Sequence, residues 1–327
     1  MSARFAGEAV EVLAGALGDL GSRNAPLGRR TTYRVGGNAA VLVEADSESD
    51  LSAVHVALAT VGGPVPVLVL GQGSNLLVAD AGFPGLVVAL GPGLSEVVVK
   101  GTTLRGGGGA KLPVLARRAA ALGLRGFEWA VGVPGSVGGA LAMNAGGHGS
   151  DTAASLARFR SFDLASGAAT EAAADALDFG YRRSALGPAD VVVWAEFALT
   201  AGDPERAEAA LGEIVRWRRA HQPGGANAGS VFTNPPGDSA GRLVEAAGCK
   251  GERLGSAHVS EKHANFVQAD AGGSADDVRH LIDRVRDMVA QRLGVTLQTE
   301  VRLVGFADVV PATVRAFTST STGGRGR

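Results

Sequence analysis

Two glycine-rich segments hold the residues whose types and spacing are best suited to binding an anion. LVLGQGSNLLVAD at residues 68–80 places Gly71, Gly73 and two small polar side chains at the end of an apolar run. VGVPGSVGGALAMNAGGHG at residues 131–149 contains seven glycines. Successive backbone N–H groups in glycine turns form nests for anions, and the first turn of a helix attracts them as well. Two such segments beside one α/β unit suggest the pyrophosphate of a dinucleotide.

Each segment also has a purely structural interpretation. The first could be an ordinary hairpin turn, and it is not the G-x-G-x-x-G of a Rossmann unit, because Leu76 follows Asn75 and a strand continues. In the second segment, residues 137–142 would suit a helix start whose N-terminus faces an anion. So much glycine in one stretch is unfavourable in backbone entropy, which favours a functional reason for it.

A serine loop is the third candidate. NAGSVFTNPPG at residues 227–237 places Ser230 between a flexible run and a short apolar pair. No histidine or lysine stands near Ser230 in the sequence to activate it as a nucleophile. Taken alone, the pattern indicates a turn serine that caps local backbone groups.

Composition narrows the function classes. The chain has 327 residues, of which 46% are hydrophobic, and a net charge of −1. This length allows two or three domains, and the charge gives no electrostatic footprint for nucleic acid. The RWRR run at 216–219 fits a solvated helix face. The single cysteine, Cys249, excludes an intramolecular disulfide, a thiolate zinc cage and a multi-cysteine iron–sulfur site. The histidines have no metal-like spacing, so we expect no metal.

The N-terminal residues lack the basic-then-apolar layout of a signal peptide. Acidic residues interrupt the stretch, which indicates an amphipathic helix instead. No apolar run reaches the roughly 18 residues that a membrane-spanning helix needs. We therefore expect a cytoplasmic protein without a membrane partner.

Secondary-structure patterns indicate the elements that must position these segments. Helices are expected at residues 7–20, 47–61, 110–122, 203–221, 239–247 and 274–293. Strands are expected as a pair at 32–45, as three at 64–90, and at 94–104, 156–199, 231–232, 256–268 and 296–304. Asp203 as N-cap and Pro204 in the first turn mark the start of the fourth helix. The low-complexity residues after 316 are expected to be disordered.

Eight sequence blocks in order resemble the UDP-N-acetylenolpyruvoylglucosamine reductases, also called UDP-N-acetylmuramate dehydrogenases. They span about residues 31 to 305, in the order of that family. The blocks are TTYRVGG (31–37), LGQGSNLLV (70–78), GVPGSVGGALAMNAGGHG (132–149), FGYRRS (179–184), AGSVFTNP (228–235), SAGRLVEAAGCKG (239–251), AHVSEKHANFV (257–267) and TEVRLVG (299–305). The short connection between the fifth and sixth blocks resembles the compact second subtype of the family.

The resemblance implies an α+β chain: the two-subdomain FAD-binding fold of the vanillyl-alcohol oxidase type, followed by a smaller α+β substrate-binding domain. It implies non-covalent FAD, NADPH as co-substrate, and reduction of UDP-N-acetylglucosamine enolpyruvate in peptidoglycan precursor synthesis. We expect a monomer whose partner is this small nucleotide sugar. The expected domains are an N-terminal helix (1–21), the FAD-binding region (22–202), a connecting helix (203–222), the substrate-binding domain (223–305) and a partly disordered tail (306–327).

The family's catalytic positions map onto Arg182, Ser230 and Glu300. Arg182 would bind the substrate carboxylate and stabilise the enolate, Glu300 would hydrogen-bond near it, and Ser230 would donate a proton to the enolate carbon. Arg183 is the competing arginine, although the motif register favours Arg182. Each of these side chains, without the resemblance, would be interpreted as an ordinary surface, strand-edge or turn residue.

The resemblance also implies the binding residues. The FAD candidates are Gly71, Gln72, Gly73, Ser74, Asn75, Leu76, Gly132, Pro134, Gly135, Ser136, Gly138, Gly139, Asn144, Gly146 and Gly149. The substrate candidates are Tyr181, Asn234, Lys250, Lys262 and His263. Thr233 stands where the family frequently has lysine, and Lys262 or Arg253 could compensate for the missing cation.

Two other functions are compatible with parts of this pattern. A flavin oxidase of the same fold would not need a proton donor such as Ser230, and some such oxidases attach FAD covalently through a histidine. His148 lies in the second glycine segment, where the family often has tyrosine, so we interpret it as a substitution and not as a tether. A non-enzymatic nucleotide-binding module is the other alternative, and the complete catalytic set argues against it.

Overall fold

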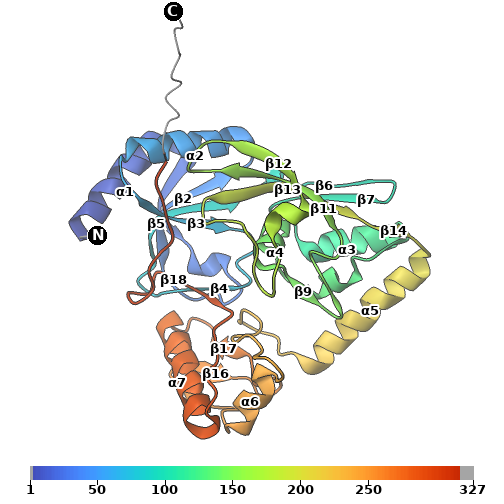
Figure 1. The fold of residues 1–327 in the computed structure, drawn as a ribbon. Helices are drawn as coiled ribbons and strands as arrows, with labels where there is room; N and C mark the ends of the chain where they lie inside the picture. The colour runs from blue at the N-terminus through green and yellow to red at the C-terminus, as the bar shows by residue number, and fades with distance from the viewer. Residues whose placement is uncertain (1–2, 317–327) are drawn as a thin grey trace, which may run out of the picture.

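A five-stranded sheet of order β1-β2-β5-β3-β19 forms the first unit of the fold within residues 3–316, which the computed structural model describes. Strands β2, β3 and β5 are parallel, while β1 and β19 pair antiparallel at the two edges. Helices α1 and α2 lie along this sheet (Figure 1), and their apolar side chains share its hydrophobic core. The bounds are α1 Ala3–Leu17, β1 Gly21–Pro26, β2 Asn38–Ala45, α2 Glu48–Thr60, β3 Val65–Leu70, β5 Phe83–Leu90 and β19 Thr313–Val314. The strand pair expected at 32–45 is wrong, because only β2 forms there and it pairs with β1 and β5.

A second five-stranded sheet, wholly antiparallel and of order β12-β11-β13-β7-β6, forms the second unit. Helices α3, α4 and α5 share its hydrophobic core. Helix α5 begins after Asp203, whose side chain accepts from the N–H of Arg206, so the expected cap is confirmed. The bounds are β6 Val97–Lys100, β7 Thr103–Gly107, α3 Leu112–Ala121, α4 Val137–Met143, β11 Leu156–Asp163, β12 Ala169–Ala173, β13 Asp190–Ala198 and α5 Pro204–His221.

Short elements complete this second unit. Strand β9 pairs with β10 as a small hairpin, and β8 pairs with β14. Their bounds are β8 Leu124–Arg125, β9 Gly146–Gly147, β10 Ser150–Asp151 and β14 Thr200–Ala201. The 3-10 turns of this unit are η4 Glu128–Gly132 and η5 Ala174–Leu177, whereas η1 Gly18–Leu20, η2 Gly28–Arg30 and η3 Pro92–Leu94 belong to the first unit.

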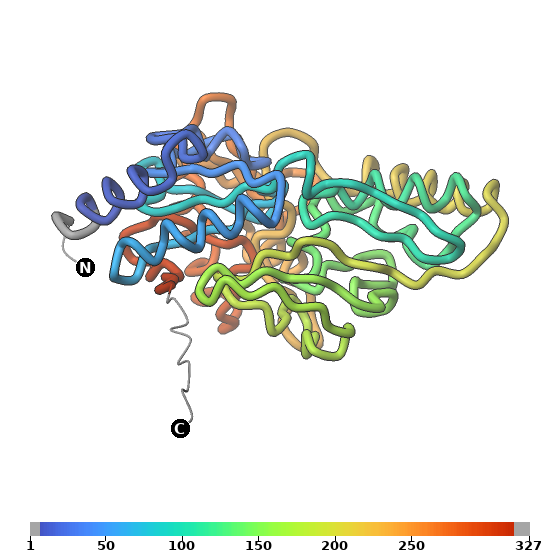
Figure 2. The backbone as a smooth tube through the Cα atoms, turned by 90° about the horizontal axis from the view of Figure 1, so that it is seen from above, coloured from blue at the N-terminus to red at the C-terminus, as the bar shows by residue number. Residues whose placement is uncertain are grey.

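The third unit is smaller and follows α5. It contains a three-stranded antiparallel sheet, β15-β16-β17, with helices α6 and α7 (Figure 1). Its bounds are α6 Ala240–Ala246, β15 Arg253–Leu254, β16 Ala257–Val259, β17 Val267–Ala269 and α7 Ala275–Leu293. Figure 2 shows the first and second units side by side, with this orange-to-red unit behind them. The expected strand at 231–232 is only an isolated bridge between Phe232 and Thr299.

Several contacts join the third unit to the first. Strand β4 (Leu76–Val78) pairs in parallel with β18 (Arg302–Val304), and the chain then returns to pair β19 with β3. Asp80 accepts from the N–H of Ala275 at 2.9 Å and so caps α7 from the first unit. These contacts hold the third unit against the first at several points.

Tyr33 makes the most deeply buried of these connections. Its side chain has no solvent exposure and lies in the hydrophobic core of the third unit, although it belongs to the segment before β2. Its hydroxyl donates to the carbonyl oxygen of Val267 at 3.0 Å, and burial raises its pKa. This insertion explains why residues 31–37 do not form the expected strand.

Among residues 3–316, no helix has the length and apolar character needed to cross a membrane. The expected disorder after residue 316 lies outside the described residues.

Candidate active site

The two glycine segments lie against each other. A Cβ added at Gly71 would lie 2.0 Å from the Oγ of Ser136, and one added at Gly135 would lie 3.5 Å from the Oγ of Ser74. Residues far apart in sequence thus line one seam between the first and second units. Glycine at position 71 leaves the room that the buried Ser136 hydroxyl occupies.

The first segment has the geometry of an anion nest. Gly73 has a φ of +59°, which an L side chain rarely adopts, and its carbonyl accepts from the N–H of Thr32 at 3.1 Å. Within the described part of the chain, the N–H groups of residues 72–75 donate to no protein acceptor. A strand, β4, follows the turn, as the sequence predicted. These amides are therefore available to a bound anion.

The second segment differs from the expectation. Helix α4 begins here, but the N–H groups of Val137 and Gly138 donate to carbonyls of the Gly108–Ala110 turn, at 3.0 and 2.8 Å. The next amide, that of Gly139, donates to the Oγ of Ser136 at 3.2 Å. The first amides of α4 are thus already bonded within the protein, so this helix start does not face an anion with free donors.

Close backbone packing accounts for glycine in this second region. A Cβ at Gly138 would lie 3.2 Å from the carbonyl oxygen of Gly108, and one at Gly108 would lie 1.8 Å from the carbonyl oxygen of Val192. Helix α4 therefore approaches strands β7 and β13 more closely than larger residues would permit. Sequence composition alone could not separate this reason from ligand binding.

The β9–β10 hairpin at the end of the second segment packs on α5. His148 has a φ of +53° in its turn, and its ring meets Trp217 edge-on at 5.1 Å. Trp217 stacks in turn on His221 at 4.5 Å. Burial, with the nearby charge of Arg218, lowers the pKa of His148. Arg218 also donates to the carbonyl oxygen of Gly132, which attaches α5 to the start of the segment.

Arg182 and Glu300 form an ion pair at the junction of the units. The Nε of Arg182 lies 2.8 Å from Oε1 of Glu300, although the N–H is not aligned as a hydrogen bond. Both side chains are largely shielded, with 27% and 14% exposure. Burial raises the pKa of Glu300, and the guanidinium only partly offsets that effect. The neighbouring Arg183 instead pairs with Asp178 at 3.2 Å.

The turn that carries Arg182 is held by the second glycine segment. Arg182 has a φ of +56° between Gly180 and Arg183, which exchange backbone hydrogen bonds at 3.1 and 3.3 Å. The side-chain amide of Asn144 donates to the carbonyl oxygen of Gly180 at 3.3 Å. A left-handed conformation at a non-glycine residue is a local strain that commonly marks functional positions.

The segment that carries Glu300 is held by the first glycine segment and by the serine loop. The side-chain amide of Asn75 donates to the carbonyl oxygen of Glu300 at 3.1 Å. The N–H of Glu300 donates to the carbonyl oxygen of Val231 at 2.7 Å, so the backbone beside Ser230 runs next to Glu300. Among residues 3–316, the half-buried Ser230 has no hydrogen-bond partner for its hydroxyl.

The substrate candidates are dispersed. Tyr181 is 62% exposed beside Arg182, whereas Lys250 pairs with Glu245 at 3.1 Å and Asn234 accepts from the N–H of Ala240 at 3.0 Å. These latter contacts lie within the third unit and do not involve the ion pair at the junction.

Two further candidates also make contacts within the protein. His263 accepts from the N–H of Asn265 at 3.2 Å, and burial lowers its pKa. Lys262 donates to the carbonyl oxygen of Arg219, and Arg253 pairs with Asp270 at 2.7 Å. The contacts of these two cations are therefore not with Thr233.

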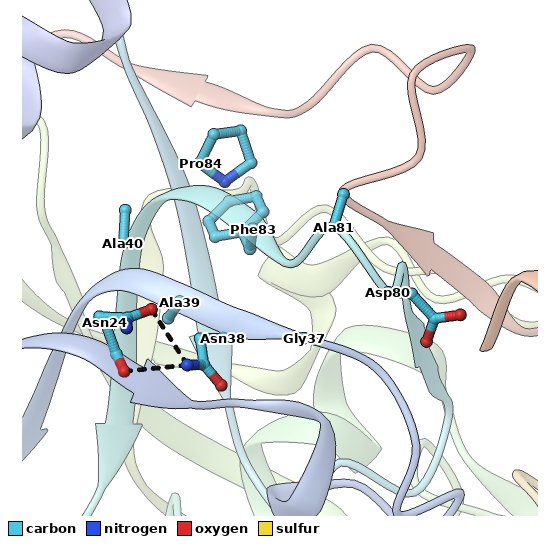
Figure 3. Close-up of a pocket in the computed structure, with 9 residues that line it drawn as sticks. All are labelled: Asn24, Gly37, Asn38, Ala39, Ala40, Asp80, Ala81, Phe83 and Pro84. Carbon is cyan, nitrogen blue, oxygen red and sulfur yellow. Dashed lines mark hydrogen bonds between the residues drawn. The ribbon is translucent and has the colours of Figure 1, made fainter. Parts of the chain in front are cut away.

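A shallow hollow lies elsewhere, beside the starts of β2 and β5 (Figure 3). Within it, the amide of Asn38 donates to the side-chain oxygen of Asn24 at 3.0 Å, while Asp80 points away from that pair. The hollow contains none of the site residues expected from the sequence. Its lining is Asn24, Gly37, Asn38, Ala39, Ala40, Asp80, Ala81, Phe83 and Pro84.

Sequence reasoning missed Asn265, which bonds the backbone of Phe232 near Ser230, and Tyr33, which anchors the segment before β2 in the third unit. Tyr33 lies in the TTYRVGG block and is one of only two tyrosines, which was the available signal. Asn265 lies in AHVSEKHANFV, and only its contacts in the fold distinguish it from other asparagines.

Two family models match this chain. One, described as a FAD binding domain, matches residues 39–172, and one described as the C-terminal domain of UDP-N-acetylenolpyruvoylglucosamine reductase matches residues 221–304. The glycine seam fits the group that the first model names, because it combines unbonded amides at 72–75 with backbone that side chains would obstruct. Fold and site together define a FAD-containing oxidoreductase.

Curated relatives and a solved structure extend the match to most of the chain. A UDP-N-acetylenolpyruvoylglucosamine reductase 2 of Symbiobacterium thermophilum is 44% identical over 286 residues, covering 86% of this chain and 92% of that protein. The reductase of Rubrobacter xylanophilus is also 44% identical, with 86% and 94% coverage. The crystal structure of the Thermus caldophilus reductase has a TM-score of 0.75 at 35% identity, covering 86% and 97% of the two chains. The chain belongs to the UDP-N-acetylenolpyruvoylglucosamine reductase family, and the expected FAD-binding fold with its C-terminal domain is confirmed.

Proposed function

We propose that this chain reduces UDP-N-acetylglucosamine enolpyruvate to UDP-N-acetylmuramate with NADPH as the hydride source. The observation that carries the proposal is the Arg182–Glu300 ion pair at 2.8 Å, with the serine loop bonded to the backbone of Glu300. Arg182, Ser230 and Glu300 are then the residues that act on the enolpyruvyl group. Family membership supports this reaction class.

FAD supplies the hydride when it is bound, and residues 71–75 with 132–136 are proposed to hold it. Arg182 receives the substrate carboxylate, since a guanidinium stays charged and binds carboxylates in a bidentate manner. Negative charge that develops beside that carboxylate is stabilised by the same guanidinium. The double bond gains one hydride at its terminal carbon and one proton at the neighbouring carbon, which balances the reduction.

Ser230 is proposed to supply that proton, which solvent then replaces. Its hydroxyl has no partner among residues 3–316, so it is free to face a ligand. A serine hydroxyl is a weak acid, and its position must compensate for that. Glu300 is proposed to hold the Arg182 guanidinium and to hydrogen-bond near the substrate carboxylate; burial raises the pKa of its carboxyl, and Arg182 partly offsets that effect.

Tyr181, Asn234, Lys250, Lys262 and His263 remain the proposed contacts to the nucleotide sugar. Tyr181 has the strongest support, because it is exposed beside Arg182. A monomeric state and a cytoplasmic location belong to the same proposal.

The deciding experiment compares two half-reactions. Anaerobic mixing with NADPH measures flavin reduction, and later addition of UDP-N-acetylglucosamine enolpyruvate measures flavin reoxidation. We expect Ser230→Ala to keep the first rate and to lose about 10²-fold or more in the second, the usual contribution of general acid catalysis. Equal loss in both half-reactions, or in neither, would remove the proton-donor role.

A matched arginine pair tests the site assignment. Arg182→Ala should abolish most substrate-dependent turnover, while Arg183→Ala, whose arginine pairs with exposed Asp178, should retain it. Denaturation should release unmodified FAD; flavin that stays attached to the chain would favour the oxidase alternative with His148 as tether.

A further inference from the structure

The short segment that follows Ser230 is held by a side chain in place of a neighbouring strand. Asn265 is 3% exposed and lies in the turn between β16 and β17. Its Oδ1 accepts from the N–H of Phe232 at 3.0 Å, and its Nδ2 donates to the carbonyl oxygen of Phe232 at 2.8 Å. Its own carbonyl oxygen accepts from the N–H of Val231 at 2.9 Å. The side-chain amide and the carbonyl oxygen of Asn265 are therefore all hydrogen-bonded to Val231 and Phe232.

The other edge of the same segment meets the segment that carries Glu300. Phe232 forms an isolated bridge with Thr299, and the carbonyl oxygen of Val231 accepts from the N–H of Glu300 at 2.7 Å. Residues 231–232 are consequently bonded on one side to Asn265 and on the other to 299–300. The position of Ser230 relative to Glu300 is set by this three-part arrangement.

We propose that Asn265 is a positioning residue for proton donation: it fixes Ser230 opposite the enolpyruvyl group by pairing with the backbone of Phe232. This inference rests on the proposed role of Ser230. Asparagine is required because the pairing needs one donor and one acceptor at adjacent atoms of a planar group. Aspartate has the same shape, but when ionised it has no donor for the carbonyl of Phe232.

The test uses the full-length holoenzyme with Asn265→Asp. We expect unchanged FAD content and flavin reduction by NADPH, but about a hundredfold slower reoxidation by UDP-N-acetylglucosamine enolpyruvate, as expected when a catalytic group is displaced by about 1 Å. Reoxidation should recover on acidification relative to the wild type, because a protonated carboxyl again offers a donor to Phe232. A reoxidation rate like that of the wild type would overturn the proposal.

A control variant that is destabilised to a similar degree separates a positioning role of Asn265 from a general loss of stability. Val285→Ala removes buried methyl groups from α7 in the same core, and an apolar side chain takes no part in the hydrogen bonds of residues 231–232. It should leave both half-reactions intact; if it slows reoxidation as much as Asn265→Asp, Asn265 has only a structural role. If Asn265→Asp does not fold, Asn265→Ala, which buries no charge, takes its place. It should likewise keep flavin reduction by NADPH and slow reoxidation by the enolpyruvyl substrate.

A double variant distinguishes this inference from the proposed function. If Asn265 acts through Ser230, adding Asn265→Asp to Ser230→Ala should slow reoxidation no further. Additive losses would overturn the positioning role while leaving Ser230 as the donor. A Ser230→Ala enzyme with normal reoxidation would instead overturn the proton-donor role of Ser230, whereas a wild-type enzyme that UDP-N-acetylglucosamine enolpyruvate does not reoxidise would overturn the proposed function itself.

Discussion

The two glycine segments resemble each other in composition but have different structural reasons for their glycines. In the first, Gly73 supplies a left-handed turn whose neighbouring amides, at 72–75, have no acceptor within residues 3–316. In the second, Gly138 lets α4 approach β7, and the first amides of the helix are already bonded. Glycine content therefore does not locate an anion site by itself; the bonding state of the amides does.

Each segment also holds one charged residue of the candidate site, through an asparagine. Asn75 bonds the backbone of Glu300, and Asn144 bonds the turn that carries Arg182. The ion pair between Arg182 and Glu300 therefore links the two glycine segments. Both segments thus position a charged residue of the candidate site. The first also leaves backbone amides without an acceptor in the described part of the chain, and these are available to a ligand.

The largest expected effect is that of Gly73→Ala. A Cβ there would lie 2.6 Å from the carbonyl oxygen of Arg30 and would be held at a φ of +59°. We expect a loss of about 2–4 kcal/mol in unfolding free energy, together with most of the bound FAD. Flavin content per chain and urea unfolding measure both.

Gly147→Ala is the matched control from the second segment, where a Cβ meets nothing within 4 Å. Its unfolding free energy should equal that of the wild type. If Gly73→Ala is as harmless as this control, the first segment is an ordinary turn.

Asn144→Ala should have the next largest effect. Asn144 has a φ of +40°, donates to Gly180 and Asp151, and accepts from the N–H of Ala153 at 3.1 Å. Loss of these bonds and the strain of alanine should lower the unfolding free energy by about 2–3 kcal/mol and impair turnover. Asn144→Gly should restore only about 1 kcal/mol, the strain part, without restoring turnover. Full rescue by glycine would show that the side-chain bonds do not matter.

Asn75→Ala tests the corresponding asparagine of the first segment. It loses one bond to Glu300, so the unfolding free energy should fall by only about 1 kcal/mol. Turnover should fall more than stability, because the backbone of Glu300 is no longer fixed to the nest. A loss as large as that of Asn144→Ala would contradict the difference between the two connections.

The smallest expected effect is a pH dependence of stability that arises from His148 in the second segment. The pKa of His148 is lowered in the folded protein, so the unfolded chain binds more protons near its ordinary value of 6.5. The stability contribution of His148 is therefore complete above that pH and is lost as the pH falls below it. Melting temperatures of His148→Phe between pH 8 and pH 5 should decline less than those of the wild type. Parallel curves would show that protonation of His148 is not coupled to folding.

The sequence predicted the parts of this molecule that depend on local chemistry. The capped start of α5 at Asp203, helices α6 and α7, and the strand after the first glycine turn are all present as expected. Contacts between distant residues could not be predicted from local patterns. The burial of Tyr33 in the third unit and the pairing of Asn265 with Phe232 each require the finished fold. The bonding of the Val137 and Gly138 amides could not be predicted for the same reason, since their acceptors at 108–110 belong to another turn.

The pairing of β19 with β3 has a consequence for synthesis of the chain. Strand β3, VPVLVL, is an apolar sheet edge, and the N–H of Val67 donates to the carbonyl oxygen of Ala312 at 3.0 Å. During translation, that edge stays uncovered until residues 312–314 have left the ribosome. An exposed apolar edge strand templates association between chains. Translation that stops just before residue 312 would thus leave a nascent protein with its site residues complete but its aggregation-prone edge open.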